Sequence, residues 1–241
     1  MILMTGVHAD LPTPFRGAGD HIAVDLGGAQ ALFTTCRGGN LGTTVGPQSA
    51  DVLANRRALA DSLGVTLAFA HQVHGTRVMT GDAHPASPEQ ADGQATTVTG
   101  VAATVMVADC LPVAVAGDGG VAMVHAGWRG LAGGIVGAGV ERLRALGVSG
   151  PLSAAIGPGA GPCCYEVGDE VHRAFSGHGA AVRRGANVDL KAIATRELER
   201  AGVEHIHDLG LCTICSDPTL FFSHRRDRGV TGRQAGLAWL R

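Results

Sequence analysis

Lysine is almost absent from the sequence, and the net charge is small. Lys191 is the single lysine in 241 residues, and the formal net charge is -2. Proteins that bind the phosphate backbone of nucleic acids use a stripe or patch of positive side chains, which this composition does not supply. We therefore expect no nucleic-acid partner.

Long apolar runs are also missing. No apolar stretch reaches the ~18 residues that a membrane-spanning helix needs. The opening residues, MILMTGVHADLPTPF, contain neither the basic segment nor the sustained apolar segment of a secretion signal. We expect a cytoplasmic protein with no membrane contact.

Cysteine is too sparse for a disulfide scaffold. The chain has 6 cysteines in 241 residues, and a reducing compartment keeps such thiols unpaired. We therefore interpret them as free thiols or metal ligands: Cys36, Cys110, Cys163, Cys164, Cys212 and Cys215.

The composition that remains is that of a globular protein with a sizeable core. Hydrophobic residues make up 45% of the chain and charged residues 17%, and no linker or repeat divides it. The 37 glycines are spread along the sequence, as in tight turns and close backbone approaches. We expect one domain over residues 1–241, with residues 1–20 at its periphery, as a monomer or a small homo-oligomer.

Strands and helices interleave along the sequence. Apolar alternation and turn signals predict strands at 21–26, 30–35, 65–73, 101–110, 111–116, 121–126, 152–159 and near the end of 221–240. Helical spacing predicts helices over 49–63, 131–147, 165–175 and 189–202. The adjacent strands joined by GDGG form a hairpin, which favours an α+β fold with mixed sheets over a purely parallel one.

Three residues that can ligate a metal each stand where a strand runs into a turn. His74 ends the strand with HQVHG, Cys110 ends VMVADC, and His125 ends AMVHA. Mixed sheets present such residues to a shared cleft. Two imidazoles and a thiolate make a three-ligand zinc site with an open fourth position, the arrangement expected for catalysis, and copper is a second candidate metal.

Two other interpretations of these residues stay open. Each histidine alone is more often a buried residue that has found a hydrogen bond. Cys110 and His125 alone form the pair of a cysteine nucleophile and its base. His74 separates the alternatives, because a metal needs it and a cysteine hydrolase does not.

Further ligand patterns are weaker. Cys212 and Cys215, in CTIC, have the spacing of half a structural zinc site. The available complement, Cys163 and Cys164, is adjacent in sequence, which we interpret as poorly placed for a tetrahedral site, so we expect ordinary buried thiols. The HIH segment at 205–207 has the spacing used by copper oxidases, but one such pair is too few for a multicopper site.

Arginines supply the candidate anion ligands. Arg129 follows Trp128 at the start of a predicted helix, where a guanidinium suits a phosphate, although a surface salt bridge is the alternative. A second group forms either a phosphate site or a solvated turn: Arg225, Arg226, Arg228 and Arg233.

The motifs taken together resemble the YfiH-like family, whose members are variously labelled multicopper polyphenol oxidoreductase or laccase domain, peptidoglycan editing factor and purine nucleoside phosphorylase. The resemblance covers nearly the whole chain from Phe33 on, and ADCLPV followed by HAGWRG is its most specific part. The matching segments occur in the family order: QVHG (72–75), ADG (91–93), ADCLPV (108–113), HAGWRGLAGGIV (125–136), IGPGAGPCCYEVG (156–168) and FFSHRRDRGVTGR (221–233).

This resemblance implies a single-domain α/β/β/α sandwich with mixed sheets, in which the residues matching His74, Cys110 and His125 hold zinc. It implies purine nucleosides and phosphate as partners: phosphorolysis of adenosine, inosine, guanosine and S-methyl-5′-thioadenosine, with adenosine deamination as a second activity. The older laccase label agrees poorly with the histidine count.

One segment departs from the family pattern. FTTCRGGNLG places Cys36 where the family arginine would fall, shifts an arginine to Arg37, and lacks the loop that would precede Asn40. We expect Arg129 and Arg37 to bind phosphate and Asn40 to bind ribose or base. Asp109 is the candidate acid–base group beside the catalytic Cys110 and His125, although strand alternation points it away unless the chain turns there.

Two rival functions remain at this stage. A cysteine or metal hydrolase that edits peptidoglycan precursors would alter cell-wall peptides in a strain that lacks the protein. A non-catalytic partner, such as a cell-division accessory protein, would turn over no purine nucleoside and bind no zinc.

Overall fold

Two six-stranded sheets form the centre of the molecule. The computed structural model describes residues 11–42, 49–81 and 89–241. The first sheet contains, in spatial order, β1 (Arg16–Ala18), β2 (His21–Asp25), β3 (Ala29–Phe33), β14 (Gln234–Leu240), β7 (Val101–Val107) and β4 (Thr66–Ala68). The second contains β13 (His205–Asp208), β10 (Ser153–Ile156), β8 (Leu111–Gly117), β9 (Gly120–Ala126), β6 (Gly93–Thr96) and β5 (Val78–Thr80). Each sheet has parallel and antiparallel pairs, which confirms the expected mixed sheets.

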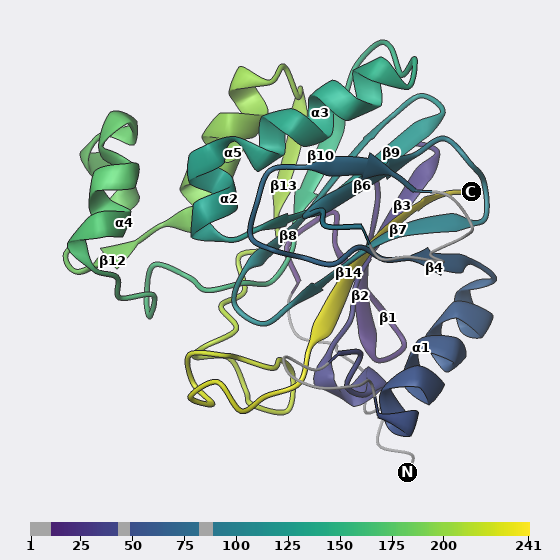
Figure 1. Cartoon of the computed structure of the whole chain (residues 1–241), viewed down its shortest axis with the longest axis horizontal. Helices are drawn as coiled ribbons and strands as arrows, with labels where there is room; N and C mark the ends of the chain where they lie inside the picture. Colours follow the sequence, from purple (N-terminus) through teal and green to yellow (C-terminus); the bar gives the residue numbers. More distant parts are fainter. Residues whose placement is uncertain (1–10, 43–48, 82–88) are drawn as a thin grey trace.

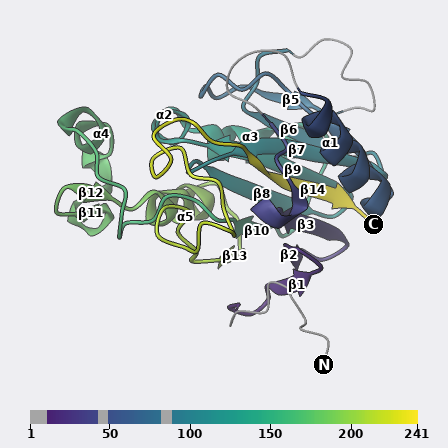
Figure 2. The same cartoon turned by 90° about the horizontal axis from the view of Figure 1, so that it is seen from below.

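Helices cover the outer faces of the two sheets (Figures 1 and 2). Helix α1 (Ala50–Leu63) packs on the first sheet, whereas α2 (Trp128–Gly133), α3 (Ile135–Ala145) and α5 (Leu190–Arg200) pack on the second. Helix α4 (Asp169–Ala174) and the small hairpin β11 (Arg183–Arg184) and β12 (Asn187–Val188) lie to one side. Short 3-10 turns cover Cys36–Gly38, Ser176–His178 and Ala180–Val182. This layering confirms the expected α/β/β/α sandwich.

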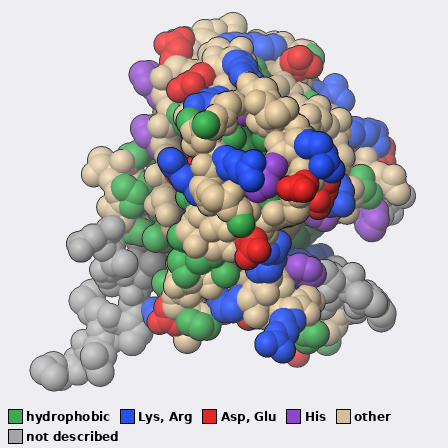
Figure 3. Space-filling view, turned by 90° about the vertical axis from the view of Figure 1, so that its left-hand side faces the viewer, with side chains coloured by type: hydrophobic (Ala, Val, Ile, Leu, Met, Phe, Trp, Pro, Cys, Tyr) green, Lys and Arg blue, Asp and Glu red, His purple; other side chains and the backbone are tan. Residues whose placement is uncertain are grey.

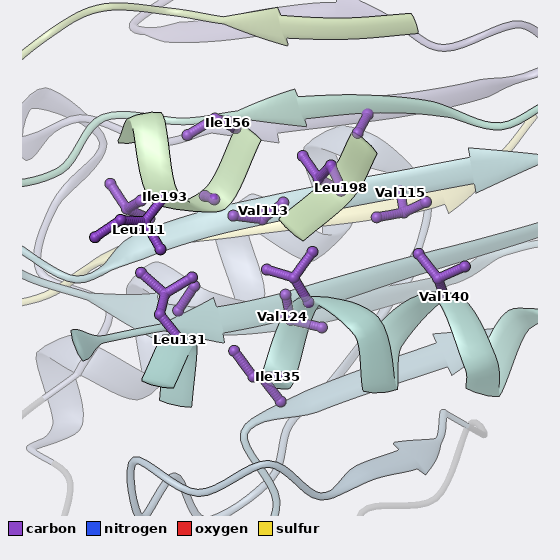
Figure 4. Close-up of a cluster of buried hydrophobic side chains, with 14 of the residues drawn as sticks. Leu111, Val113, Val115, Val124, Leu131, Ile135, Val140, Ile156, Ile193 and Leu198 are labelled. Carbon is purple, nitrogen blue, oxygen red and sulfur yellow. The ribbon is translucent and has the colours of Figure 1, made fainter. Parts of the chain in front are cut away.

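Strand alternation builds three layers of core. In β8, Leu111, Val113 and Val115 pack toward the helices of the second sheet (Figure 4), while Ala114 and Ala116 face the first sheet. The third layer lies under α1 and includes Leu59. Such burial of apolar surface is the main stabilising term of the fold, at about 25 cal/mol per Å².

Several expected boundaries were wrong. The helix expected over 131–147 begins earlier, at Trp128, and divides at Gly134, whose φ of 90° places it in the left-handed region. The helix expected from 165 begins only at Asp169, and the strand expected over 65–73 is confined to Thr66–Ala68. Strands β1, β5 and β6 were not expected, because they are short and weakly apolar.

The ends of α1 and the edge of the first sheet follow simple rules. The hydroxyl of Ser49 accepts from the amide of Val52 at 3.3 Å, and Gly64, with φ 66°, ends the helix as expected. Strand β1 is an edge strand, and Phe15 beside it is buried in the core between the sheets. Within the described ranges, no helix has the length and apolarity needed to cross a membrane.

Candidate metal centre

His74, Cys110 and His125 meet at one end of the sheets. Their ligand atoms all lie within 4.8 Å of one another, and the two imidazole rings meet edge to face with centroids 4.8 Å apart. The pairing of β8 with β9 places Pro112 opposite His125, so Cys110, just before β8, lies beside the end of β9. The structure therefore brings together the three residues that the sequence placed at strand ends.

A buried carboxylate, Asp92, organises this centre. Its oxygens accept hydrogen bonds from the amides of Val73 at 3.0 Å, His74 at 2.9 Å and Gly75 at 2.7 Å. The same carboxylate contacts Nδ1 of His125 at 2.8 Å. These bonds hold His74 at its unusual φ of 59° and leave Nε2 of His125 as the ligand atom.

Asp92 is a functional residue that we did not single out from the sequence. It lies in the ADG segment at 91–93, directly before β6, and is completely buried. A buried acid needs several hydrogen bonds or a positive partner. The signal that could have identified Asp92 in the sequence is an acidic residue between an alanine and a glycine at the start of a buried strand.

The two imidazoles favour the thiolate form of Cys110. Burial alone would raise the pKa of Cys110, but the charge and hydrogen bonds of His125 and His74 lower it to about 6. Burial likewise acts to lower the pKa of His125, but Cys110 and Asp92 raise it to about 9. A thiolate is the form that ligates metals and attacks as a nucleophile, so the geometry supports either chemistry at Cys110.

Position 127, beside this centre, has no room for a side chain, so it requires a glycine. A Cβ atom there would lie 2.9 Å from Sγ of Cys110 and 3.1 Å from Cδ2 of His74. Its backbone, with φ -74° and ψ 167°, is ordinary extended chain. This glycine therefore permits the close approach of the Cys110 and His74 side chains.

Asp109 lies beside Cys110 on the same cavity. The chain turns at Asp109, whose φ is 87°, so the alternation that would have pointed it away is broken. Its carboxylate accepts from the hydroxyl of Thr213 at 2.6 Å and from the amide of Arg225 at 2.7 Å. The buried carboxylate is thus fixed by two loops that are distant in sequence.

The centre opens into a cavity of about 580 Å³ with a positive wall. Among the described residues that line it, Asp109 is the one carboxylate. Four arginines line the same cavity: Arg56, Arg129, Arg225 and Arg233. Figure 3 looks onto the side of the molecule where α4 and the loop before β14 lie, and it shows Arg and His side chains interspersed with Asp and Glu side chains. Such a wall suits an anionic ligand.

Aromatic rings lie beside three of these arginines, and the guanidinium of Arg56 lies 4.5 Å from the ring centre of Phe69. The guanidinium of Arg129 lies 4.3 Å from the ring centre of Trp128, and that of Arg225 lies 5.1 Å from the ring of Tyr165. Stacking restricts a long side chain without using its hydrogen-bond donors. The donors of Arg129 therefore remain available to a ligand in the cavity.

Arg37 and Asn40 stand elsewhere. Among the described residues, those that line the cavity include neither of them. The side-chain oxygen of Asn40 accepts from the amides of Gly42 at 3.0 Å and Arg233 at 2.8 Å, so it braces the backbone at a cavity residue. Arg37 belongs to the Cys36–Gly38 turn. The phosphate contact of Arg37 and the ribose or base contact of Asn40 stay predictions.

The other residues that the sequence offered as phosphate or metal ligands lie outside the described lining of the cavity. Arg226 is an internal brace, because it pairs with Asp227 at 2.8 Å and donates to the carbonyl of Thr213 at 3.1 Å. Arg228 is exposed. His205 and His207 lie on edge strand β13 and belong to neither of the metal-ligating groups found among the described residues.

A second ligand group was not expected. The sulfur atoms of Cys163, Cys164, Cys212 and Cys215 all lie within 4.8 Å of one another. The expectation that adjacent cysteines are poorly placed for such a cluster was wrong, because a turn at 161–165 replaces the extended backbone that would have separated them.

A comparison with protein families matches residues 27–241 to the family described as multi-copper polyphenol oxidoreductase laccase. A protein of Xylella fastidiosa named purine nucleoside phosphorylase is 42% identical over 231 residues, covering 87% of this chain and 86% of that protein. The Escherichia coli protein named purine nucleoside phosphorylase YfiH is 36% identical over 214 residues, covering 83% of this chain and 86% of its own length.

Solved structures show the same fold. The structure of the Bacillus licheniformis hypothetical protein YfiH superposes with a TM-score of 0.86 at 30% identity, covering 95% of this chain and 100% of that one. The structure of YlmD from Geobacillus stearothermophilus superposes with a TM-score of 0.79 at 35% identity, covering 89% and 92%.

Proposed function

Because the chain belongs to the multi-copper polyphenol oxidoreductase laccase family, and its relatives are named purine nucleoside phosphorylases, we propose that it is a metal-dependent purine nucleoside phosphorylase. The observation that carries this proposal is one cavity that joins a thiolate and two histidines to four arginines. The substrates are adenosine, inosine, guanosine and S-methyl-5′-thioadenosine together with phosphate.

Arginines of the cavity wall bind phosphate. In phosphorolysis a phosphate oxygen forms a bond to C1′ of the ribose while the bond from C1′ to N9 of the purine breaks, giving ribose 1-phosphate and the free base. Arg129, Arg225 and Arg233 come from two segments that face the same cavity. Guanidinium groups bind phosphate oxygens in pairs and fix the attacking oxygen in place, which lowers the entropic part of the barrier.

Trp128 and Tyr165 supply flat apolar surface for the purine. Both rings line the cavity, and both also line a neighbouring cavity of about 380 Å³. The departing base must gain a proton or a hydrogen bond at N9 or N7. Asp109, the described carboxylate on the cavity wall, is our candidate for holding the proton that the base receives.

The donor set fits zinc. Two imidazole nitrogens and one thiolate within 4.8 Å of one another are sufficient for a three-coordinate protein site with an open position. Zinc held by His74, Cys110 and His125 would supply a Lewis acid and would lower the pKa of water, which is the chemistry that deamination of adenosine to inosine and ammonia requires. We propose this deamination as a second activity, in which Asp109 moves protons between the water and the leaving amino group.

A direct assay tests the proposal. The metal-loaded protein, given inosine and phosphate, is expected to release hypoxanthine and ribose 1-phosphate in equal amounts. Removal of the metal with a chelator should abolish the reaction, and addition of zinc should restore it. Metal-loaded protein that releases no base from any of the four nucleosides would overturn the proposal.

The low pKa of Cys110 beside His125 favours one alternative, a cysteine hydrolase that acts on peptidoglycan precursors. His74→Ala separates the two. A metal-dependent enzyme loses both the bound ion and its activity, whereas a cysteine nucleophile needs only Cys110 and His125. Alkylation of Cys110 by a peptide-like substrate analogue would be the positive sign of the hydrolase.

Two histidines and a cysteine also form the ligand set of blue-copper sites. Copper at this centre would give an intense visible absorption from the thiolate, and zinc gives none. A colourless protein whose metal content is zinc supports the phosphorylase proposal, while a blue protein that oxidises phenols would overturn it.

A further inference from the structure

We propose that Cys163, Cys164, Cys212 and Cys215 form a second metal site that binds one zinc ion through four thiolates. The four sulfur atoms lie within 4.8 Å of one another, and none of the four residues belongs to the centre of His74, Cys110 and His125. The inference is independent of the proposed nucleoside chemistry, because none of the four cysteines lines the substrate cavity.

The spacing of the sulfurs fits an ion. Zinc–sulfur bonds of about 2.3 Å in a tetrahedron place the sulfur atoms roughly 3.8 Å apart. Sγ of Cys163 and Sγ of Cys215 lie 3.5 Å apart, and the remaining separations stay within 4.8 Å. A disulfide needs a distance of about 2.05 Å, and all four cysteines are unpaired thiols.

Two turns present the four side chains. The amides of Cys164 and Tyr165 both donate to the carbonyl of Gly161 at 3.0 Å, which winds this segment like a turn of helix. Adjacent side chains on such a turn diverge by about 100° and not by 180°, so Cys163 and Cys164 can face one centre. The amide of Ser216 donates to the carbonyl of Cys212 at 3.1 Å, which winds the second turn. Cys212 and Cys215, three residues apart, then share a face.

The surroundings suit a thiolate site. The amide of Gly161 donates to Sγ of Cys212 at 3.2 Å, the kind of hydrogen bond that stabilises negative sulfur. A Cβ atom at Gly161 would lie 3.0 Å from Cβ of Cys212 and 3.2 Å from Sγ of Cys163, so only glycine fits without displacement. The ammonium of Lys191, the single lysine, donates to the carbonyl of Leu211 at 2.9 Å, one residue before Cys212.

The site links the loop of Ala160 to the loop of Thr213, and both of these residues bond Asp109. Strands β10 and β13 run parallel, and the loops that follow them continue to pair, with the amide of Thr213 donating to the carbonyl of Gly159 at 3.0 Å. Thr213 bonds the carboxylate of Asp109, and the amide of Ala160 bonds its carbonyl at 2.7 Å. Zinc at the cysteine cluster therefore has a structural role: it stabilises the loops that position Asp109 at the cavity.

Metal content of the whole chain tests the site. Protein purified under reducing conditions is expected to hold one zinc ion for each of the two groups, measured by plasma mass spectrometry. The double variant Cys163→Ser with Cys215→Ser should lose one ion per chain, and His74→Ala should lose the other. Cys36→Ser, which changes a thiol outside both groups, is the matched control and should lose none. Unchanged zinc in the double variant would overturn the proposal.

Thiol reactivity of the unaltered chain tests the same site without any variant. Cys163 and Cys215 are exposed, so as free thiols they would react with iodoacetamide at once. We expect both to be protected until a chelator removes the ion. Cobalt substitution should add thiolate-to-metal charge-transfer bands that the double variant lacks. Immediate alkylation, pairing of the four cysteines as disulfides, or iron in place of zinc would each overturn the assignment.

Discussion

Nδ1 of His125 lies 2.8 Å from Oδ1 of Asp92, in a carboxylate that no solvent reaches. A ligating histidine that donates its second ring nitrogen to a carboxylate is fixed in one tautomer and one orientation. The same carboxylate accepts the amide of His74 at 2.9 Å, so one buried acid controls the positions of two of the three candidate ligands.

Replacing this acid should weaken metal binding more than it weakens the fold. Asp92→Asn keeps the shape but presents an amide nitrogen to a donor, so we expect a loss of about 10- to 100-fold in metal affinity. Competition with a chelator of known affinity measures it. Asp118→Asn, in an exposed hairpin turn, is the control and should bind metal normally. Equal affinities in the two variants would contradict the role of Asp92.

Adding one methyl group at Gly127 should expel the metal. In Gly127→Ala the new Cβ meets Cys110 and His74 at 2.9 and 3.1 Å, and overpacking of this kind costs about 1–3 kcal/mol or displaces the ligands. Gly137→Ala, in α3 with no atom within 4 Å of the new Cβ, should bind metal fully and gain about 0.5–1 kcal/mol in stability. Metal analysis and thermal unfolding of both variants test the contrast.

The metal-free protein should be most stable between about pH 6 and about pH 9. The pKa of Cys110 falls from 9.0 to about 6 on folding, so its contribution is fully present above pH 9.0 and is lost as the pH falls through about 6. The pKa of His125 rises from 6.5 to about 9, so its contribution is fully present below pH 6.5 and is lost as the pH rises through about 9.

Denaturant unfolding across this pH range measures the effect, with the thiolate absorbance as a second readout. Cys110→Ser removes the pair and should flatten the profile between the two limits. A thiolate that appears only near pH 9 in the metal-free protein would show that the Cys110–His125 ion pair does not form.

Phosphate binding should depend on Arg129. A hydrogen bond to a charged group contributes about 1.5–3 kcal/mol, so Arg129→Met should raise KM for phosphate roughly 10- to 100-fold. KM for the nucleoside should change little. Arg57→Met, an exposed arginine of α1 outside the cavity, is the control. A larger effect on the nucleoside than on phosphate would reassign Arg129 to the base or ribose.

Local pattern predicted much of the fold because single strands and helices carry their own signals. The hairpin of β8 and β9 was predicted from alternation and a turn signal, and helix α1 was predicted from helical spacing. The division at Gly134 was missed because a left-handed residue between two helices leaves the apolar spacing almost unchanged. Short strands such as β5 form only because β6 lies beside them, and no local signal encodes that neighbour.

At the site, the expected strand ends predicted the three candidate ligands. The sequence did not predict which distant residues form hydrogen bonds with residues of the site. The hydrogen bond between Asp92 and His125 joins residues 33 positions apart in the sequence, and the one between Thr213 and Asp109 joins residues 104 positions apart. The cysteine cluster joins residues across 52 positions. Cys163 and Cys164 would point apart on an extended backbone, but hydrogen bonds to the carbonyl of Gly161 wind this segment into a turn that the sequence does not signal.

Strand β14 lies between β3 and β7, so the first sheet is divided until this strand arrives. A messenger with a premature stop before codon 234 would yield a product with two unpaired sheet edges in place of one buried strand, and exposed edges promote aggregation. Arg225 and Arg233, which precede β14, would lose the anchor that sets them over the cavity. Truncated products should therefore be cleared by proteolysis, and a fusion joined at the C-terminal side needs a linker that lets β14 enter the sheet.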